Sequence, residues 1–153
     1  KFTKPPTGEV LAINRIKDIH QKIPNTHLVM HGSSSVPKEL LDIINDNGGK
    51  ISETYGVPIK EIQEGIKNGV RKVNIDTDLR LAATAAVRKY FFKNPEQFDP
   101  RKYLIESKNE MKKIVIQRLT EFKSAGNASK IKPLPLSLMS KRYSSGELLQ
   151  NIN

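Results

Sequence analysis

The chain of 153 residues has no cysteine and no tryptophan. Without cysteine it can form neither disulfides nor thiolate metal sites, so a metal ion would have to be held by histidine and carboxylate side chains. A cysteine-free sequence is compatible with a cytoplasmic protein, which is the location we expect.

Long apolar runs are also absent. No stretch approaches the roughly 20 apolar residues that a membrane helix requires, so we expect no membrane span. The first residues, KFTKPP, include neither an initiator methionine nor the apolar core of a signal peptide. We therefore expect the sequence to come from a longer chain.

Acidic residues are few, 16 against 26 lysines and arginines, which gives a net charge of +10. Such a charge attracts polyanions or phosphorylated small molecules. The basic residues are scattered among acidic ones, aromatic residues make up only 6% of the chain, and there is no Arg/Gly-rich or RNP-like tract. We therefore expect no nucleic-acid partner, and a basic nucleic-acid-binding module stays as the alternative from another functional class.

Apolar residues recur at helical spacing in several segments, and proline or glycine bounds most of them. They predict a helix over 9–23, helices that begin at Pro37 and at Pro58, and helices over 78–93 and 100–122. In the last of these we expect Lys112, Lys113 and Arg118 to form a solvated face. Two prolines exclude regular helix over 132–136, and a short amphipathic arm is expected to follow them.

Two short apolar segments end in polar residues. The first, 28–30, is predicted to be a buried strand and leads into HGSSS at 31–35. At the end of such a strand His31 can bind a metal or move a proton, and the glycine and serines offer donors to a phosphate. The alternative to a functional role is that His31 is a strand-end histidine whose ring only forms ordinary hydrogen bonds. We interpret His20 and His27 as structural.

The second segment, Val70 to Ile75, is predicted to be another buried strand that leads into NIDTD at 74–78. Asn74, Asp76 and Thr77 carry groups that can bind a substrate hydroxyl or phosphate. The alternative is that the acidic and hydroxyl residues only cap the next helix. Strand, polar loop and helix in alternation indicate a parallel sheet, in which both polar loops lie at one edge.

These two motifs, at this separation, resemble the class II, metal-dependent fructose-bisphosphate aldolases. The resemblance covers nearly the whole chain and its tail is similar to the Calvin-cycle-type branch. It continues through ETYGVP at 53–58, GVRKV at 69–73, LRLA at 79–82, FDPRKYL at 98–104, and RY and GEL at 142–148.

The resemblance implies an α/β fold, the C-terminal portion of a TIM (β/α)₈ barrel, with about the last two to three βα units, the C-terminal helices and a tail. Residues 1–126 would belong to the barrel and residues 127–153 would form a C-terminal extension. A complete barrel of this kind is about twice as long as this chain.

The resemblance also implies the site. His31 would be one of three histidines that bind a catalytic zinc ion. The side chains and backbone of Gly32, Ser33, Ser34, Asn74, Ile75, Asp76 and Thr77 would hold dihydroxyacetone phosphate. Arg101 resembles an arginine that reaches into the site of a neighbouring subunit. The general acid/base residue would lie outside this chain, in the amino-terminal half.

The implied activity is that of a lyase: reversible aldol cleavage of fructose 1,6-bisphosphate into dihydroxyacetone phosphate and glyceraldehyde 3-phosphate, in glycolysis, gluconeogenesis or the Calvin cycle. Zinc would polarise the ketone and stabilise an enediolate. The whole enzyme would be a homo-oligomer, a dimer or tetramer, and the fragment alone would be inactive. Tagatose-bisphosphate aldolase of the same family is the alternative.

Overall fold

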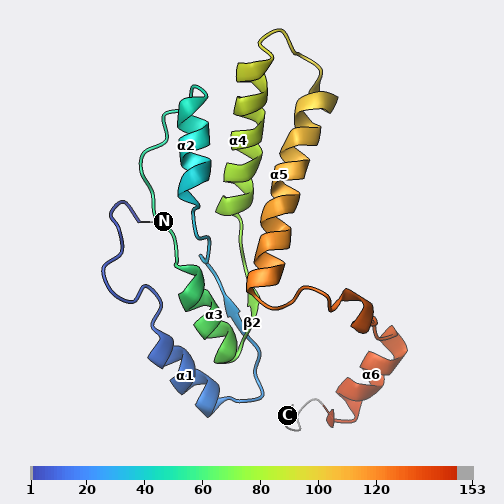
Figure 1. The fold of residues 1–153 in the computed structure, drawn as a ribbon. Coiled ribbons are helices and arrows are strands. Elements are labelled where there is room, and N and C mark those ends of the chain that lie inside the picture. Colours follow the sequence, from blue (N-terminus) through green and yellow to red (C-terminus); the bar gives the residue numbers. More distant parts are fainter. Residues whose placement is uncertain (1, 148–153) are drawn as a thin grey trace.

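Two parallel strands and a series of helices make up the part of the chain that the computed structural model describes, residues 2–147 (Figure 1). In chain order the elements are α1 (Ile13–Lys22), β1 (Leu28–Met30), α2 (Lys38–Asp46), α3 (Ile59–Lys67), β2 (Val70–Val73), α4 (Thr77–Lys93), α5 (Pro100–Glu121), the 3₁₀ turn η1 (Ala128–Lys130) and α6 (Leu136–Ser144).

The strands β1 and β2 are adjacent and parallel, with Leu28 opposite Val70 and Met30 opposite Val73. The chain leaves β1, runs through α2 and α3, and returns as β2, which confirms the expected alternation of strands and helices. Ile75, which we expected to extend the second strand, lies beyond its end. Parallel strands bring their carboxyl ends to the same edge, and so residues 31–35 and 74–78 follow neighbouring strand ends.

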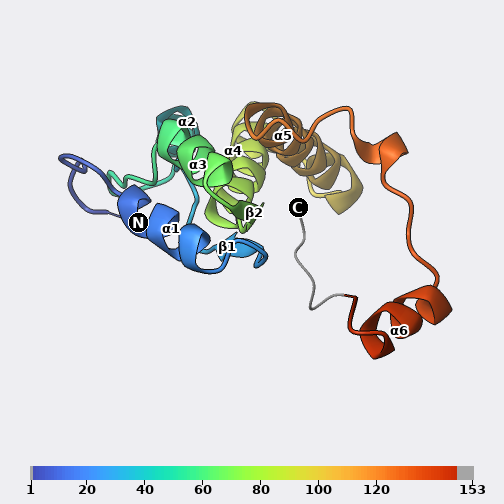
Figure 2. The same ribbon diagram turned by 90° about the horizontal axis from the view of Figure 1, so that it is seen from below.

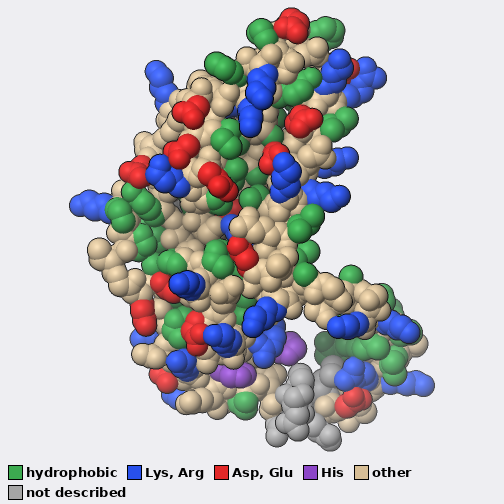
Figure 3. Space-filling model, in the orientation of Figure 1, with side chains coloured by type: hydrophobic (Ala, Val, Ile, Leu, Met, Phe, Trp, Pro, Cys, Tyr) green, Lys and Arg blue, Asp and Glu red, His purple; other side chains and the backbone are tan. Residues whose placement is uncertain are grey.

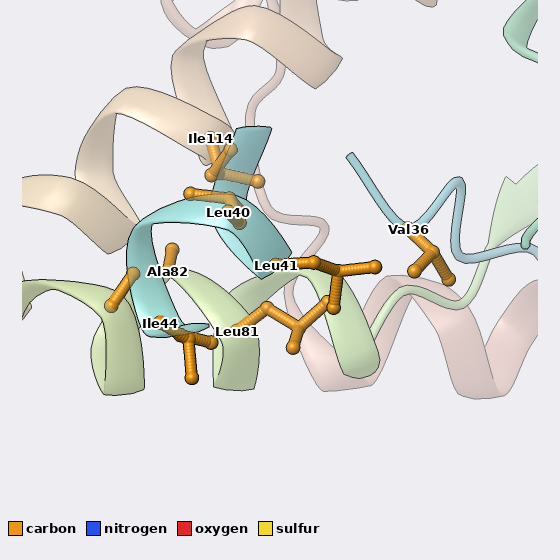
Figure 4. Close-up of a cluster of buried hydrophobic side chains, with 8 residues drawn as sticks. Val36, Leu40, Leu41, Ile44, Leu81, Ala82 and Ile114 are labelled. Carbon is orange, nitrogen blue, oxygen red and sulfur yellow. The ribbon is translucent and has the colours of Figure 1, made fainter. Parts of the chain in front are cut away.

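Two apolar clusters hold the helices in place. The first joins α2, α4 and α5 (Figure 4), and it allows close helix packing because α4 contributes small side chains. Its buried members are Val36, Leu40, Leu41, Ile44, Leu81, Ala82, Ala85 and Ile114. The second joins the strands to α3 through the buried residues Met30, Val57, Ile62 and Val70. Helix α1 packs against it through the partly buried Ile16.

Helix α1 begins later than its apolar spacing predicts, at Ile13 instead of residue 9. The backbone N–H groups of Val10 and Leu11 both donate to Oε2 of Glu61, at 2.9 and 2.6 Å. This carboxylate of α3 holds the residues just before α1 in a non-helical conformation. A sequence pattern cannot show such a contact across 50 residues.

The segment after α5 differs from the rest of the fold. Neither η1 nor α6 contains a buried residue, and α6 lies apart from the other helices (Figure 2). α6 begins directly after Pro135, which agrees with the expected break at the two prolines. Residues 148–153, which belong to the predicted extension, lie outside the described residues.

Among residues 2–147, no helix is both long enough and apolar enough to cross a membrane. Lysine and arginine side chains alternate with acidic ones over the face seen in Figure 3, as the scattered charges of the sequence predict.

Candidate functional site

The ends of β1 and β2 bring His31 and Asn74 into contact. The side-chain nitrogen Nδ2 of Asn74 lies 2.9 Å from Nδ1 and 3.4 Å from Nε2 of the His31 ring. The backbone of Asn74 is fixed as well, because its N–H donates to the carbonyl of Met30 at 2.9 Å. His31 is exposed to solvent and Asn74 is half-buried. The two residues that the sequence places in separate motifs are therefore side by side.

A second contact joins the two loops at the beginning of α4. The hydroxyl oxygen of Ser34 accepts hydrogen bonds from the backbone N–H groups of Thr77, at 3.1 Å, and Asp76, at 3.4 Å. These N–H groups stand at a helix N-terminus, where they carry partial positive charge and bind anions. The Ser34 oxygen occupies the position where an oxygen atom of a phosphate group would find two backbone donors.

The other predicted residues lie around these contacts. Gly32 is exposed and has φ +67°, a conformation that glycine adopts without strain. Ser33 is buried, and its hydroxyl donates to the carbonyl of His31 at 3.3 Å. Ile75 is half-buried, and the exposed carboxylate of Asp76 is paired with Nε of Arg80 at 2.8 Å. A substrate hydroxyl would therefore compete with Arg80 for Asp76.

The alternative that the acidic residues only cap α4 is wrong for the described structure. Asp76 stands at the N-cap position but makes no side-chain cap hydrogen bond. Asp78 is fully buried, and its carboxylate accepts from Ser35 N–H at 3.1 Å, Ser35 Oγ at 3.0 Å and Val36 N–H at 2.9 Å. Asp78 thus binds the loop after β1 and does not cap its own helix.

Arg118 also contradicts the expectation of a solvated face on α5. Its side chain is only 7% exposed, and Nη2 donates to Oδ2 of Asp78 at 3.2 Å and to Oγ of Ser35 at 2.6 Å. Nη1 donates to Glu121 at 2.6 Å. Arg118 lies four residues after the buried Ile114, on the same helix face. That spacing indicates that Arg118 faces the core, but it does not show the ion pair with Asp78 that keeps a charged side chain there.

The backbone of this loop is tightly confined. Val36 has φ +52°, a conformation that costs a β-branched residue about 1–3 kcal/mol. Gly56 packs directly on the loop: a Cβ atom on it would lie 2.2 Å from the carbonyl oxygen of Ser34. That same carbonyl accepts the N–H of Val57 at 3.0 Å. The loop after β1 is therefore held by α4 through Asp78, by α5 through Arg118, and by the segment of Gly56 and Val57.

Arg101 is not brought together with the other predicted site residues. It lies in the first turn of α5, seventeen residues before Arg118, which corresponds to about 25 Å along the helix axis. Its guanidinium forms two-pronged contacts with Asp99, 2.7 Å between Nη2 and Oδ2, and is largely exposed. These hydrogen bonds, together with the one from the Arg101 backbone N–H, lower the pKa of Asp99 below its ordinary value of 3.8.

Among residues 2–147 no three histidine or carboxylate side chains gather into a group that could hold a metal ion. His31 is the histidine at the strand ends. His20 is half-buried against Gly69, where a Cβ would lie 2.5 Å from its Nδ1, and His27 is exposed just before β1. The chain thus offers a metal ion one histidine at this edge of the sheet.

Comparison with known proteins gives the family. The family model described as class-II fructose-bisphosphate aldolase matches residues 2–127. Fructose-bisphosphate aldolases of Stutzerimonas stutzeri and Pseudomonas aeruginosa are 64% and 62% identical over all 153 residues. A protein named fructose-bisphosphate aldolase class 2, from Synechocystis, is 62% identical over 148 residues, 97% of this chain.

The match covers only 43% of the Stutzerimonas and Pseudomonas proteins and 41% of the Synechocystis protein. The chain therefore spans less than half the length of these relatives. The family has a TIM-barrel fold. The described part of this chain is α/β, with two parallel strands and their helices. This chain belongs to the class-II fructose-bisphosphate aldolase family.

Proposed function

We propose that this chain supplies one metal ligand and the binding site for dihydroxyacetone phosphate in an enzyme that reversibly cleaves fructose 1,6-bisphosphate. It would be the C-terminal part of the barrel, and the remaining metal ligands and the general acid/base would come from the rest of the protein. Two contacts between the loops after β1 and β2 support the proposal most directly. His31 meets Asn74, and the Ser34 hydroxyl meets the backbone N–H groups of Asp76 and Thr77.

The phosphate end of the substrate would bind at Gly32, Ser33 and Ser34 and at the N-terminus of α4. The N–H groups of Asp76 and Thr77 would donate to it once the Ser34 hydroxyl turns away. Asn74 and Asp76 would hold the substrate's polar groups next to His31. Fixing the phosphate in this way positions the carbon atoms that react, and such positioning is itself a source of rate acceleration.

His31 fits the role of a single zinc ligand. Its ring is exposed at a strand end, and the neighbouring Asn74 amide can orient it. In the structure the NH₂ group of Asn74 faces Nδ1. Flipping the side-chain amide would bring its oxygen there, so that Nδ1 would donate its proton and Nε2 would keep a lone pair for the metal. A divalent metal bound there would act as a Lewis acid on the ketone oxygen of the substrate.

Arg101 would act in a second subunit, because about 25 Å of helix separates it from the loop beside Arg118 in its own chain. The whole enzyme would accordingly be a homo-oligomer in the cytoplasm. Its substrate would be the fructose and not the tagatose bisphosphate, since the relatives at 55–64% identity carry fructose in their names.

The experiment is a chimera in which this chain replaces the matching part of the Pseudomonas aeruginosa relative. We expect the chimera to cleave fructose 1,6-bisphosphate, to lose activity when a chelator removes its metal, and to regain it with zinc. Tagatose 1,6-bisphosphate is the competing substrate. A soluble, folded chimera without aldolase activity, or one that prefers the tagatose substrate, would contradict the proposal.

A further inference from the structure

The buried ion pair between Asp78 and Arg118 lies directly behind the loop after β1. Asp78 has no exposed surface, and its two carboxylate oxygens bind the loop at adjacent residues: Oδ1 accepts from Val36 N–H, and Oδ2 accepts from both the N–H and the hydroxyl of Ser35. Arg118 closes the network by donating to Asp78 and to Ser35.

Asp78 is also rigidly linked to the donors on the opposite side of the loop. It is the second residue of α4, and the N–H groups of Asp76 and Thr77 just before it are the ones that meet the Ser34 hydroxyl. One side chain therefore fixes the distance between the loop after β1 and the N-terminus of α4. Both must face the same phosphate group if the proposed function is correct.

We propose that Asp78 and Arg118 are positioning residues for the phosphate of the substrate. Neither touches the substrate. They act through Ser35 and Val36, and hold the preceding residues of the loop at the spacing from α4 that lets both sets of donors reach one phosphate. The strained φ of Val36 agrees with this role, since such a conformation persists where its surroundings enforce it. The inference rests on the proposed function.

The test uses the active chimera with Asp78→Asn. The amide keeps one oxygen acceptor, but its NH₂ group faces the donors of Ser35 and Arg118, so the loop separates from α4. We expect KM for fructose 1,6-bisphosphate and the inhibition constant for inorganic phosphate both to rise about tenfold or more, with a smaller change in kcat and unchanged zinc content.

Glu121→Gln is the matched control, because it removes the other carboxylate partner of Arg118 at the side away from the loop. This control should lower thermal stability without raising KM. If Asp78→Asn does not fold, Ser35→Ala removes only the hydroxyl that joins Asp78 to Arg118, and KM should still rise with kcat nearly unchanged.

Equal KM in parent and variants, or KM changes in Glu121→Gln as large as in the loop variants, would show a purely structural role and overturn the inference. A parent chimera without activity would contradict the proposed function itself and remove the basis of this inference. An active parent whose variants bind phosphate normally would contradict the inference alone.

Discussion

At the scale of single residues, the three histidines of the chain differ in what they can do. We expect His31→Ala in the chimera to lower the zinc content of the purified protein and to reduce aldolase activity roughly 1000-fold, since metal polarisation contributes several kcal/mol to catalysis. Metal analysis and a cleavage assay on the same preparation would measure both.

His27→Ala is the control for that variant, because His27 is also exposed but lies before β1. Its zinc content and activity should match those of the parent. Zinc bound at the parent level by His31→Ala would refute the assignment of His31 as a ligand.

Gly56 gives a second prediction at this scale. In Gly56→Ala the new methyl group would meet the backbone carbonyl of Ser34, which cannot move aside without displacing the loop. We expect a clear fall in the melting temperature and a rise in KM of the chimera, both measured on the soluble protein.

Gly65→Ala is the comparison for Gly56→Ala. Its new methyl group would approach Cε of Met30, the flexible end of a side chain, and alanine favours the helix by about 1 kcal/mol. This variant should keep the stability of the parent within about 1 kcal/mol. If both substitutions were tolerated, the loop would be less confined than the close approach of Gly56 indicates.

At the scale of elements, α5 begins with a cap that depends on pH. Asp99 accepts the N–H of Arg101 at 3.0 Å, and the pKa of its carboxyl group is lowered by the hydrogen bonds from Arg101. Since the pKa of Asp99 is lower in the folded protein than in the unfolded chain, the ionised carboxylate stabilises the fold. This stabilisation is complete at pH values above the unfolded pKa of 3.8, and it is lost as the pH falls through the lower pKa of the folded state.

Asp99→Asn tests that contribution, because asparagine keeps a good cap without a titrating group. Between pH 6 and pH 3 the melting temperature of the parent chimera should fall more steeply than that of Asp99→Asn. Parallel pH profiles would show that the Asp99 carboxylate contributes no pH-dependent stability.

Most elements could be predicted from the sequence, because apolar spacing and flanking Pro, Gly and Asn residues are local signals. β1, α2, α3, α4 and α5 lie within a few residues of their predicted places. The predicted beginning of α1 was wrong because the carboxylate of Glu61 binds the backbone N–H groups of residues 10 and 11, and this contact joins segments far apart in the sequence.

The site could be predicted only in part, because some of its contacts also join elements that are far apart in the sequence. The neighbouring positions of His31 and Asn74 follow from two parallel strands, and the structure shows the contact. The roles of Asp78 and Arg118 could not be read from local patterns, since an acid in a first helical turn is usually a cap and an arginine is usually solvated. Their burial depends on α4 and α5 both packing against the loop after β1.

At the scale of the whole molecule, the tail differs from the rest because neither η1 nor α6 contains a buried residue. We propose that residues 127–153 form an extension outside the barrel, since the described part, 127–147, contains no buried residue. Ending the chimera after residue 126 should leave its melting temperature and kcat nearly unchanged. A large loss of melting temperature or kcat would show that the tail packs on the folded enzyme. Such packing would agree with the amphipathic arm that the sequence predicts after residues 132–136.

The two-stranded sheet itself determines what the isolated chain can do. Val29 of β1 is 48% exposed, although strands of a closed barrel have side chains packed inside as well as helices outside. The chain supplies one histidine at the strand ends and, in the proposed function, no general acid/base. We therefore expect the purified chain with added zinc to show no aldol cleavage.

Co-expression with the remaining part of the Pseudomonas relative should restore activity, because in the proposed function that part would supply the other strands and cover the exposed face around Val29. Assembly should also reduce the binding of a dye that reports exposed apolar surface. The His31→Ala chain is the control: it should assemble and cover the same face, and stay inactive. Turnover by the isolated chain would mean that residues 1–153 contain a complete catalytic site, which would contradict the division of ligands proposed above.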